Sequence, residues 1–274
     1  MEISKVRTIH LGEKKARGEK IVMLTAYDCP TARLADQAGV DVVLVGDSVG
    51  NVVLGFRNTI AVTLDQMIHH CAAVRRGLER ALLVGDMPFM SYKISPEQAL
   101  TNAARMMQEG GAEAIKLEGG EEIAPTVARL VKAGIPVMGH VGLTPQSLHQ
   151  LGGYRIQGRD HVQIERLMAS ACALADAGVF AIVVELVPAT VARDLTKMIA
   201  VPTIGIGAGP HCDGQVLVLH DLLGLSPVRK RFVRVYAQLE RVITEAIRHY
   251  AADVRGGRFP SRRHSFTVPR KRGK

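Results

Sequence analysis

The sequence predicts an α/β protein built as a (β/α)8 or TIM barrel, with an extra N-terminal helix and a C-terminal helical segment. Eight short apolar runs alternate with helical patterns, and a barrel of this kind needs about 250 residues. Most runs are nearly continuous in Val, Ile and Leu, as expected for parallel strands buried on both faces. A doubly wound open sheet is the rival fold, but no Gly-x-Gly-x-x-Gly follows the first run.

The expected elements can be taken in chain order. Residues 3–17 are expected to form a helix ahead of the barrel. The eight expected strands are 21–26, 40–46, 81–85, 112–118, 135–140, 180–185, 201–207 and 215–220. Between them, Thr63 with Gln66 and Ser95 with Gln98 predict helix N-caps with capping boxes. Pairs ending in glycine stand just before four of the runs and predict left-handed helix ends, at 38–39, 110–111, 133–134 and 177–178.

The C-terminal part of the chain differs from the rest in charge. Residues 226–274 carry a net charge of +11, whereas residues 1–225 carry −2. We expect a long last helix over 229–255, one barrel domain over 1–255, and a mobile basic tail over 256–274. Because this segment lacks interleaved aromatic residues for stacking on single strands, nucleic acid is not expected as a partner.

Composition excludes several classes of protein. Hydrophobic residues make up 47% and charged residues 22% of the 274, which suits a globular protein with a sizeable core. No apolar stretch reaches the roughly 18–20 residues of a membrane span, so no membrane partner is expected. The N-terminus has no apolar run typical of a signal peptide, and the four cysteines form no Cys-x-x-Cys pair. We therefore expect a cytoplasmic protein with reduced thiols.

Acidic residues follow three consecutive expected strands. Asp47 and Ser48 follow the second strand, Asp86 the third, and Glu118 ends the fourth. In a barrel these positions lie at the catalytic face. Carboxylates held close together favour a hard cation, Mg²⁺ before Ca²⁺ or Zn²⁺. The alternative is that these acids cap the following helices or pair with Lys116.

Lys116 and Glu118 lie two residues apart on one expected strand, so their side chains share one face of it. Because apolar residues flank them, that face is the barrel interior, where a lysine needs an anion. A substrate carboxylate or oxyanion is one candidate for this anion. An internal salt bridge with Glu118 is the other.

Two further polar residues end apolar strands. Glu185 ends the most apolar run of the chain, and such surroundings make a carboxylate more basic, as a general base requires. A structural glutamate bonded to the backbone is an alternative reading of the same position. His140 ends the fifth strand and would either polarise a substrate or be a hydrogen-bonded core histidine.

Longer motifs add a resemblance to these observations. Together they resemble the ketopantoate hydroxymethyltransferase family from about residue 3 to Phe266. The motifs that carry the resemblance are TAYD (25–28), VGDSVGNVVLG (45–55), VTLDQMIHH (62–70), GDMPFMSY (85–92), KLEGG (116–120), GHVGLTPQS (139–147), GGYRIQGR (152–159), VVELVP (183–188), GIGAG (205–209) and DGQVLVLHD (213–221).

The resemblance implies an activity at the start of pantothenate synthesis. It implies hydroxymethyl transfer from 5,10-methylenetetrahydrofolate to 3-methyl-2-oxobutanoate, giving ketopantoate through an enolate that Mg²⁺ stabilises. It also implies a homo-oligomer, a decamer in this family.

The resemblance also assigns roles residue by residue. Asp47 and Asp86 match the magnesium ligands, with Glu118 as the third acid. Asp47, Ser48, Asp86 and Lys116 match residues that contact the keto acid, and Glu185 matches the proton acceptor. A Mg²⁺-dependent carbon–carbon lyase or phosphonomutase-like barrel acting on a small oxo-acid is the alternative function. A basic protein that binds nucleic acid through residues 226–274 is a second, more distant one.

Overall fold

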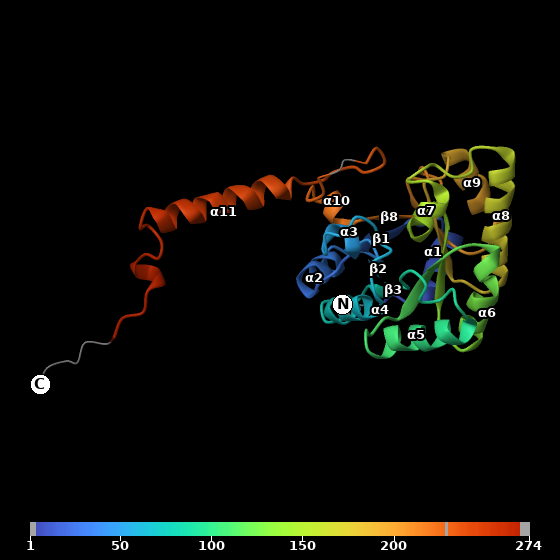
Figure 1. Cartoon of the computed structure of the whole chain (residues 1–274), viewed down its shortest axis with the longest axis horizontal. Coiled ribbons are helices and arrows are strands. Elements are labelled where there is room, and N and C mark those ends of the chain that lie inside the picture. The colour runs from blue at the N-terminus through green and yellow to red at the C-terminus, as the bar shows by residue number, and fades with distance from the viewer. Residues whose placement is uncertain (1–3, 228–229, 269–274) are drawn as a thin grey trace, which may run out of the picture. The chain divides into compact units, whose positions relative to one another are not determined.

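The computed structural model describes residues 4–227 and 230–268, which group into two compact units. The first unit comprises residues 4–219 and 230–233 and holds the barrel (Figure 1). The second comprises residues 220–227 and 234–268. The single domain over 1–255 that the sequence suggests stays a prediction.

Eight parallel strands close the barrel in sequence order, because β8 pairs back with β1. The closed ring confirms the predicted (β/α)8 barrel. The strands are β1 (Ile21–Thr25), β2 (Val42–Val45), β3 (Leu82–Asp86), β4 (Ala114–Glu118), β5 (Val137–Gly142), β6 (Ala181–Glu185), β7 (Thr203–Ile206) and β8 (Gly214–Leu217).

Helices connect the strands on the outside of the barrel: α2 (Cys29–Gln37), α3 (Val49–Val52), α4 (Leu64–Arg75), α5 (Pro96–Gln108), α6 (Ala124–Lys132), α7 (Leu148–Leu151), α8 (His161–Asp176) and α9 (Ala189–Met198). Short 3-10 turns add η1 (Glu121–Ile123) and η2 (Pro145–Ser147). At α4 the predicted capping box is present between Thr63 and Gln66. At α5 the Ser95 hydroxyl accepts the Gln98 N–H, but Gln98 Oε1 has no hydrogen-bond partner among the described residues, so the capping box predicted there is not closed. All four predicted glycine ends have positive φ angles: Gly39, Gly111, Gly134 and Gly178.

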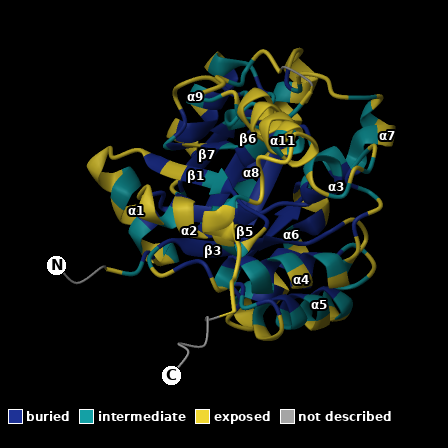
Figure 2. Cartoon of the chain, turned by 90° about the vertical axis from the view of Figure 1, so that its left-hand side faces the viewer, coloured by how far each residue is buried: buried dark blue, intermediate teal, exposed yellow. Residues whose placement is uncertain are grey.

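Alternate residues of each strand point into the barrel, and this pattern positions the polar groups. In β4, Ala114 belongs to the inner apolar cluster, so Lys116 and Glu118 take the same side at the carboxyl end of the strand. In β5, Met138 and His140 repeat this arrangement. The barrel interior is therefore apolar toward the amino ends of the strands and carries a charged layer at their carboxyl ends. Figure 2 shows most strand residues as buried, and the surrounding helices as exposed on their outer faces.

Helix α1 (Thr8–Arg17) packs on the amino-terminal end of the barrel. Its Leu11 is fully buried in the same inner cluster. Lys14 pairs with the buried Asp41 at 2.9 Å. Lys15 donates to three backbone carbonyls at the C-terminal end of α9 and just after it, those of Thr196, Ile199 and Val201. These contacts fix the face opposite the charged layer.

The second unit contains most of α10 (Leu219–Leu222), then α11 (Leu239–Arg255) and η3 (Arg262–His264). The predicted helix over 229–255 begins only at Leu239. Upstream of it, the Tyr236 N–H donates to the carbonyl of Leu222 instead of to a helical turn of its own. No helix within the described ranges 4–227 and 230–268 is long and apolar enough to cross a membrane.

Other predicted boundaries also shift. The N-terminal helix begins at Thr8 rather than residue 3, and residue 3 lies outside the described residues. The last strand ends at Leu217, because Leu219 already begins α10 and its N–H donates to the Thr25 hydroxyl. Of the predicted basic tail, residues 256–268 are described and include η3. Residues 269–274 lie outside the described part.

Candidate active site

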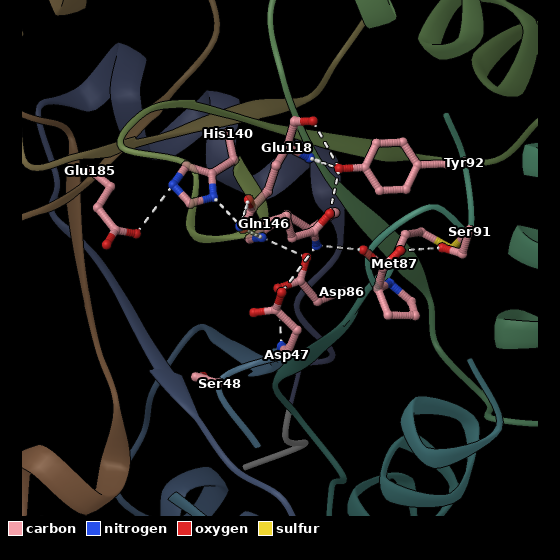
Figure 3. Close-up of polar contacts among 12 residues, drawn as sticks. Asp47, Ser48, Asp86, Met87, Ser91, Tyr92, Glu118, His140, Gln146 and Glu185 are labelled. Carbon is pink, nitrogen blue, oxygen red and sulfur yellow. Dashed lines mark hydrogen bonds and ion pairs between the residues drawn. The ribbon is translucent and has the colours of Figure 1, made fainter. Parts of the chain in front are cut away.

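Three acidic side chains from neighbouring strands converge at the carboxyl end of the barrel (Figure 3). Asp47 follows β2, Asp86 ends β3 and Glu118 ends β4. One carboxylate oxygen of each lies within 4.8 Å of the others, and all three residues are buried. Ser48, at the start of α3, hydrogen-bonds the Tyr27 hydroxyl at 2.8 Å and supplies no side-chain cap to that helix. The structure therefore brings together the predicted set.

Lys116 is the cation within this cluster. Its ammonium lies 2.5 Å from Asp86 Oδ1 and 3.6 Å from Glu118 Oε1. Strand register explains the closer contact, because Asp86 and Lys116 are direct partners across β3 and β4. The internal salt bridge that the sequence left open therefore forms chiefly with Asp86. The pKa of Lys116 is raised: burial acts to lower it, but the acids around it outweigh burial.

The three buried carboxylates repel one another, and this affects their pKa values. Burial, together with the charges of Asp86 and Glu118, raises the pKa of Asp47 well above its ordinary value. Burial also raises the pKa of Asp86, although Lys116 opposes this shift. Burial has the same direction at Glu118, but Lys116 and His140 lower the pKa of that carboxyl to about 2. One lysine therefore does not neutralise the three acids.

His140 lies between two carboxylates. Its Nδ1 lies 3.4 Å from Glu118 Oε1, and its Nε2 lies 3.3 Å from Glu185 Oε2. Among the described residues neither nitrogen has a partner in hydrogen-bond geometry. Burial and the charge of Lys116 act to lower the pKa of His140, but the two carboxylates outweigh them and raise it to about 9. When protonated, His140 carries a positive charge between the carboxylates of Glu118 and Glu185 and attracts both.

Glu185 ends β6, and 15% of its side chain is exposed. The next residue, Leu186, has a φ of 47°, a left-handed conformation that is unusual for leucine. Its carbonyl accepts the Gln157 N–H, which ties the loop containing Gly152–Gly153 to the end of β6. The pKa of Tyr154, on that loop, is raised by burial and by the charge of Glu185.

Two buried residues of the site were not predicted from the sequence. Gln146 in η2 hydrogen-bonds both Asp47 and Glu118, and Tyr92 hydrogen-bonds Gln146 and the backbone of Glu118. Both stand inside motifs that the sequence displays, GHVGLTPQS and GDMPFMSY. A signal was therefore present, but nothing in the residue types shows that an amide and a phenol turn inward.

The acid cluster fits a hard divalent cation. Asp47, Asp86 and Glu118 offer only oxygen atoms, and such ligand sets suit Mg²⁺ better than Zn²⁺. A divalent cation would also relieve the mutual repulsion that raises the pKa of Asp47. The cluster is thus a candidate metal site at the catalytic face of the barrel.

Comparison with known proteins bears on this site. A family model described as ketopantoate hydroxymethyltransferase matches residues 5–262. A curated 3-methyl-2-oxobutanoate hydroxymethyltransferase of Thermoanaerobacter sp. (strain X514) is 54% identical over 98% of this chain and 99% of its own length. The protein of the same name from Moorella thermoacetica is 56% identical over 96% of this chain and 98% of its own length.

Solved structures resemble the chain at the level of fold. A phosphonopyruvate hydrolase, solved in complex with oxalate and Mg²⁺, has a TM-score of 0.61 and 15% identity over 94% of this chain and 93% of its own. A 2,3-dimethylmalate lyase has a TM-score of 0.59 and 17% identity over 91% of this chain and 88% of its own. At such identities these likenesses show the barrel fold alone.

Proposed function

Since this chain belongs to the ketopantoate hydroxymethyltransferase family, we propose that it transfers a hydroxymethyl group from 5,10-methylenetetrahydrofolate to 3-methyl-2-oxobutanoate. The enzyme is a 3-methyl-2-oxobutanoate hydroxymethyltransferase and forms ketopantoate, which places it in the pantothenate pathway. The folate donor and the mechanism described below are the proposed parts. In this reaction C3 of the oxo-acid loses a proton and bonds to the methylene carbon, whose two bonds to N5 and N10 of the folate break. Water supplies the new hydroxyl group, and tetrahydrofolate leaves with the C3 proton and one proton of the water on its two nitrogens.

The charged layer of the barrel supports binding of an oxo-acid. Lys116 provides a buried positive charge for the keto-acid oxygens, and Ser48 provides a hydroxyl beside Asp47. Asp47, Asp86 and Glu118 would hold Mg²⁺ through their carboxylate oxygens. When bound, Mg²⁺ supplies Lewis acidity that stabilises negative charge developing on the keto oxygen.

Glu185 is the proposed base that removes the C3 proton. Its carboxylate lies across the His140 ring from Glu118, and its side chain is 15% exposed, which leaves it accessible to a ligand. His140 Nε2 lies 3.3 Å from Glu185 Oε2, so a positive charge on the imidazole would attract the carboxylate of the base. The observation that carries the proposal is this arrangement of three buried acids and one lysine at the ends of β2, β3 and β4, with a fourth carboxylate at the end of β6.

The direct test incubates the purified protein with 3-methyl-2-oxobutanoate and 5,10-methylenetetrahydrofolate, with Mg²⁺ or with EDTA. Product analysis by mass spectrometry should detect ketopantoate only when all three components are present. Cleavage of an oxo-acid without folate would instead favour the lyase alternative. Ketopantoate formed at full rate in EDTA would remove the proposed metal from the mechanism.

Oligomer and location are proposals that rest on family membership. We propose a cytoplasmic homo-oligomer, a decamer as the family resemblance implies, with no nucleic-acid or membrane partner. Light scattering on the full-length chain should give ten times the chain mass of 29.6 kDa. A monomer mass that persists at all protein concentrations would contradict this assembly.

A further inference from the structure

A single residue outside the predicted set contacts two of the three acids. Gln146 Nε2 donates to Asp47 Oδ2 at 3.0 Å, and the Gln146 backbone N–H donates to Glu118 Oε2 at 3.0 Å. Gln146 lies in η2, just after β5, and is 2% exposed. It therefore reaches back across the barrel mouth and links an acid that follows β2 to an acid on β4 (Figure 3).

The orientation of the Gln146 amide is determined by its neighbours. Nε2 also donates to the Met87 carbonyl at 2.9 Å, so both amide hydrogens face acceptors. The Tyr92 hydroxyl lies 2.8 Å from Gln146 Oε1 and also contacts the backbone carbonyl and N–H of Glu118. A flipped amide would place its oxygen against a carboxylate and a carbonyl, which have only lone pairs to offer. The donor end must therefore face Asp47.

These contacts fix which oxygen of Asp47 is open to a cation. Gln146 Nε2 occupies Asp47 Oδ2, so Asp47 Oδ1 is the oxygen that the Gln146 amide does not engage. At Glu118 the Gln146 backbone N–H occupies Oε2, and Oε1 lies 3.6 Å from the Lys116 ammonium and 3.4 Å from His140 Nδ1. Hydrogen bonds from neighbours commonly orient metal-ligating side chains in this way.

We propose that Gln146 is a positioning residue: its side-chain amide selects which oxygen of Asp47 faces the divalent cation, and so sets the affinity of the site. The inference rests on the metal site of the proposed function and extends it to a residue that touches neither metal nor substrate. Tyr92 supports the same arrangement, because its hydroxyl contacts Gln146 and the backbone of Glu118.

A purely structural role for Gln146 makes a different prediction. In that case its removal would lower the thermal stability of the chain and leave the affinity of the folded protein for a cation unchanged. The two roles are separated by measuring Mg²⁺ binding on EDTA-treated, substrate-free protein by isothermal titration calorimetry, below the melting temperature of each variant.

The first variant is Gln146→Leu, which keeps the bulk of the side chain and removes its hydrogen bonds to Asp47, Met87 and Tyr92, whereas the backbone N–H of residue 146 can still donate to Glu118. We expect Mg²⁺ affinity to fall about 10–100-fold, the usual effect of losing a group that orients a metal ligand. The matched control is Gln98→Leu on the outer helix α5. Gln98 Oε1 is buried and accepts no hydrogen bond from the described residues. This control should bind Mg²⁺ as the parent chain does.

The second variant is Tyr92→Phe, which removes one hydroxyl and decides the question if Gln146→Leu does not fold. It should weaken Mg²⁺ binding in the same direction by a smaller factor. In the double variant the combined loss should be less than the product of the single losses, because the two residues act through one network. Unchanged affinity in the folded single variants would overturn the inference. If the parent chain binds no Mg²⁺, the metal site fails and this inference fails with it.

Discussion

Replacing Lys116 with methionine tests whether the acid cluster is held together by one buried charge. Lys116 lies 2.5 Å from Asp86 Oδ1 and is 3% exposed, so solvent cannot compensate for its loss. Removing one partner of a buried ion pair costs about 3–5 kcal/mol. For a chain of this length each kcal/mol lowers the melting temperature by roughly 2–4 °C, so we expect a fall of about 6–20 °C in EDTA.

Magnesium should partly reverse this loss. Without the lysine, Asp47, Asp86 and Glu118 should bind the cation more tightly, and each tenfold gain in affinity returns about 1.4 kcal/mol at saturating Mg²⁺. The assay is thermal unfolding of both chains in EDTA and in Mg²⁺, followed by circular dichroism.

Lys14→Met is the matched control for this experiment. It removes a lysine from the buried Asp41 at the opposite barrel face, where Arg80 and the Val22 N–H still compensate that carboxylate. The control should lose less stability, and Mg²⁺ should raise its melting temperature by the same amount as in the parent chain. Two results would refute the reasoning. One is an equal loss of melting temperature in the two variants. The other is a difference in melting temperature between Lys116→Met and the parent chain that is as large in Mg²⁺ as in EDTA.

Three further predictions follow from the same geometry. Asp47→Asn should abolish the stabilisation by Mg²⁺. In EDTA the variant should be as stable as the parent chain or up to about 2 kcal/mol more stable, because the substitution removes a buried repulsion. Denaturant unfolding measures both effects. Because the pKa of Asp47 is raised in the folded chain, the free energy of unfolding without metal falls as the pH rises. At low pH, protons compete with Mg²⁺ for this carboxyl group. The Mg²⁺-induced rise in melting temperature should therefore grow between about pH 5 and pH 8. Leu11→Ala should lower the free energy of unfolding by about 2–5 kcal/mol, because it leaves a cavity at the amino-terminal end of the barrel. The Mg²⁺ affinity, measured by calorimetry, should not change.

The predictable part of the site follows from strand periodicity. A barrel places the carboxyl ends of its strands on one face, so Asp86 and Glu118 could be assigned to one cluster from their positions alone. Family resemblance then gave them roles. The same periodicity placed Lys116 in the interior, but its principal partner depends on the register between β3 and β4, which the sequence does not encode locally.

Other features depend on tertiary contacts and could not be predicted. Gln146 lies in a turn, where polar residues are usually solvated, and only the folded barrel turns its amide toward the acids. The start of α11 at Leu239 is a similar case. The residues before it fit a helical pattern, but Tyr236 bonds to the carbonyl of Leu222 instead.

The most direct test of the central claim is exchange of the C3 hydrogen of 3-methyl-2-oxobutanoate in heavy water, followed by proton NMR without folate. The parent chain should catalyse exchange in Mg²⁺. Glu185→Gln should lower the rate at least about 100-fold, because a positioned base contributes that much. Glu165→Gln is the matched control, since Glu165 also pairs with a histidine at 3.3 Å but on the exposed surface of α8. It should exchange normally. Undiminished exchange in Glu185→Gln, with the oxo-acid still bound, would contradict the assignment of the base.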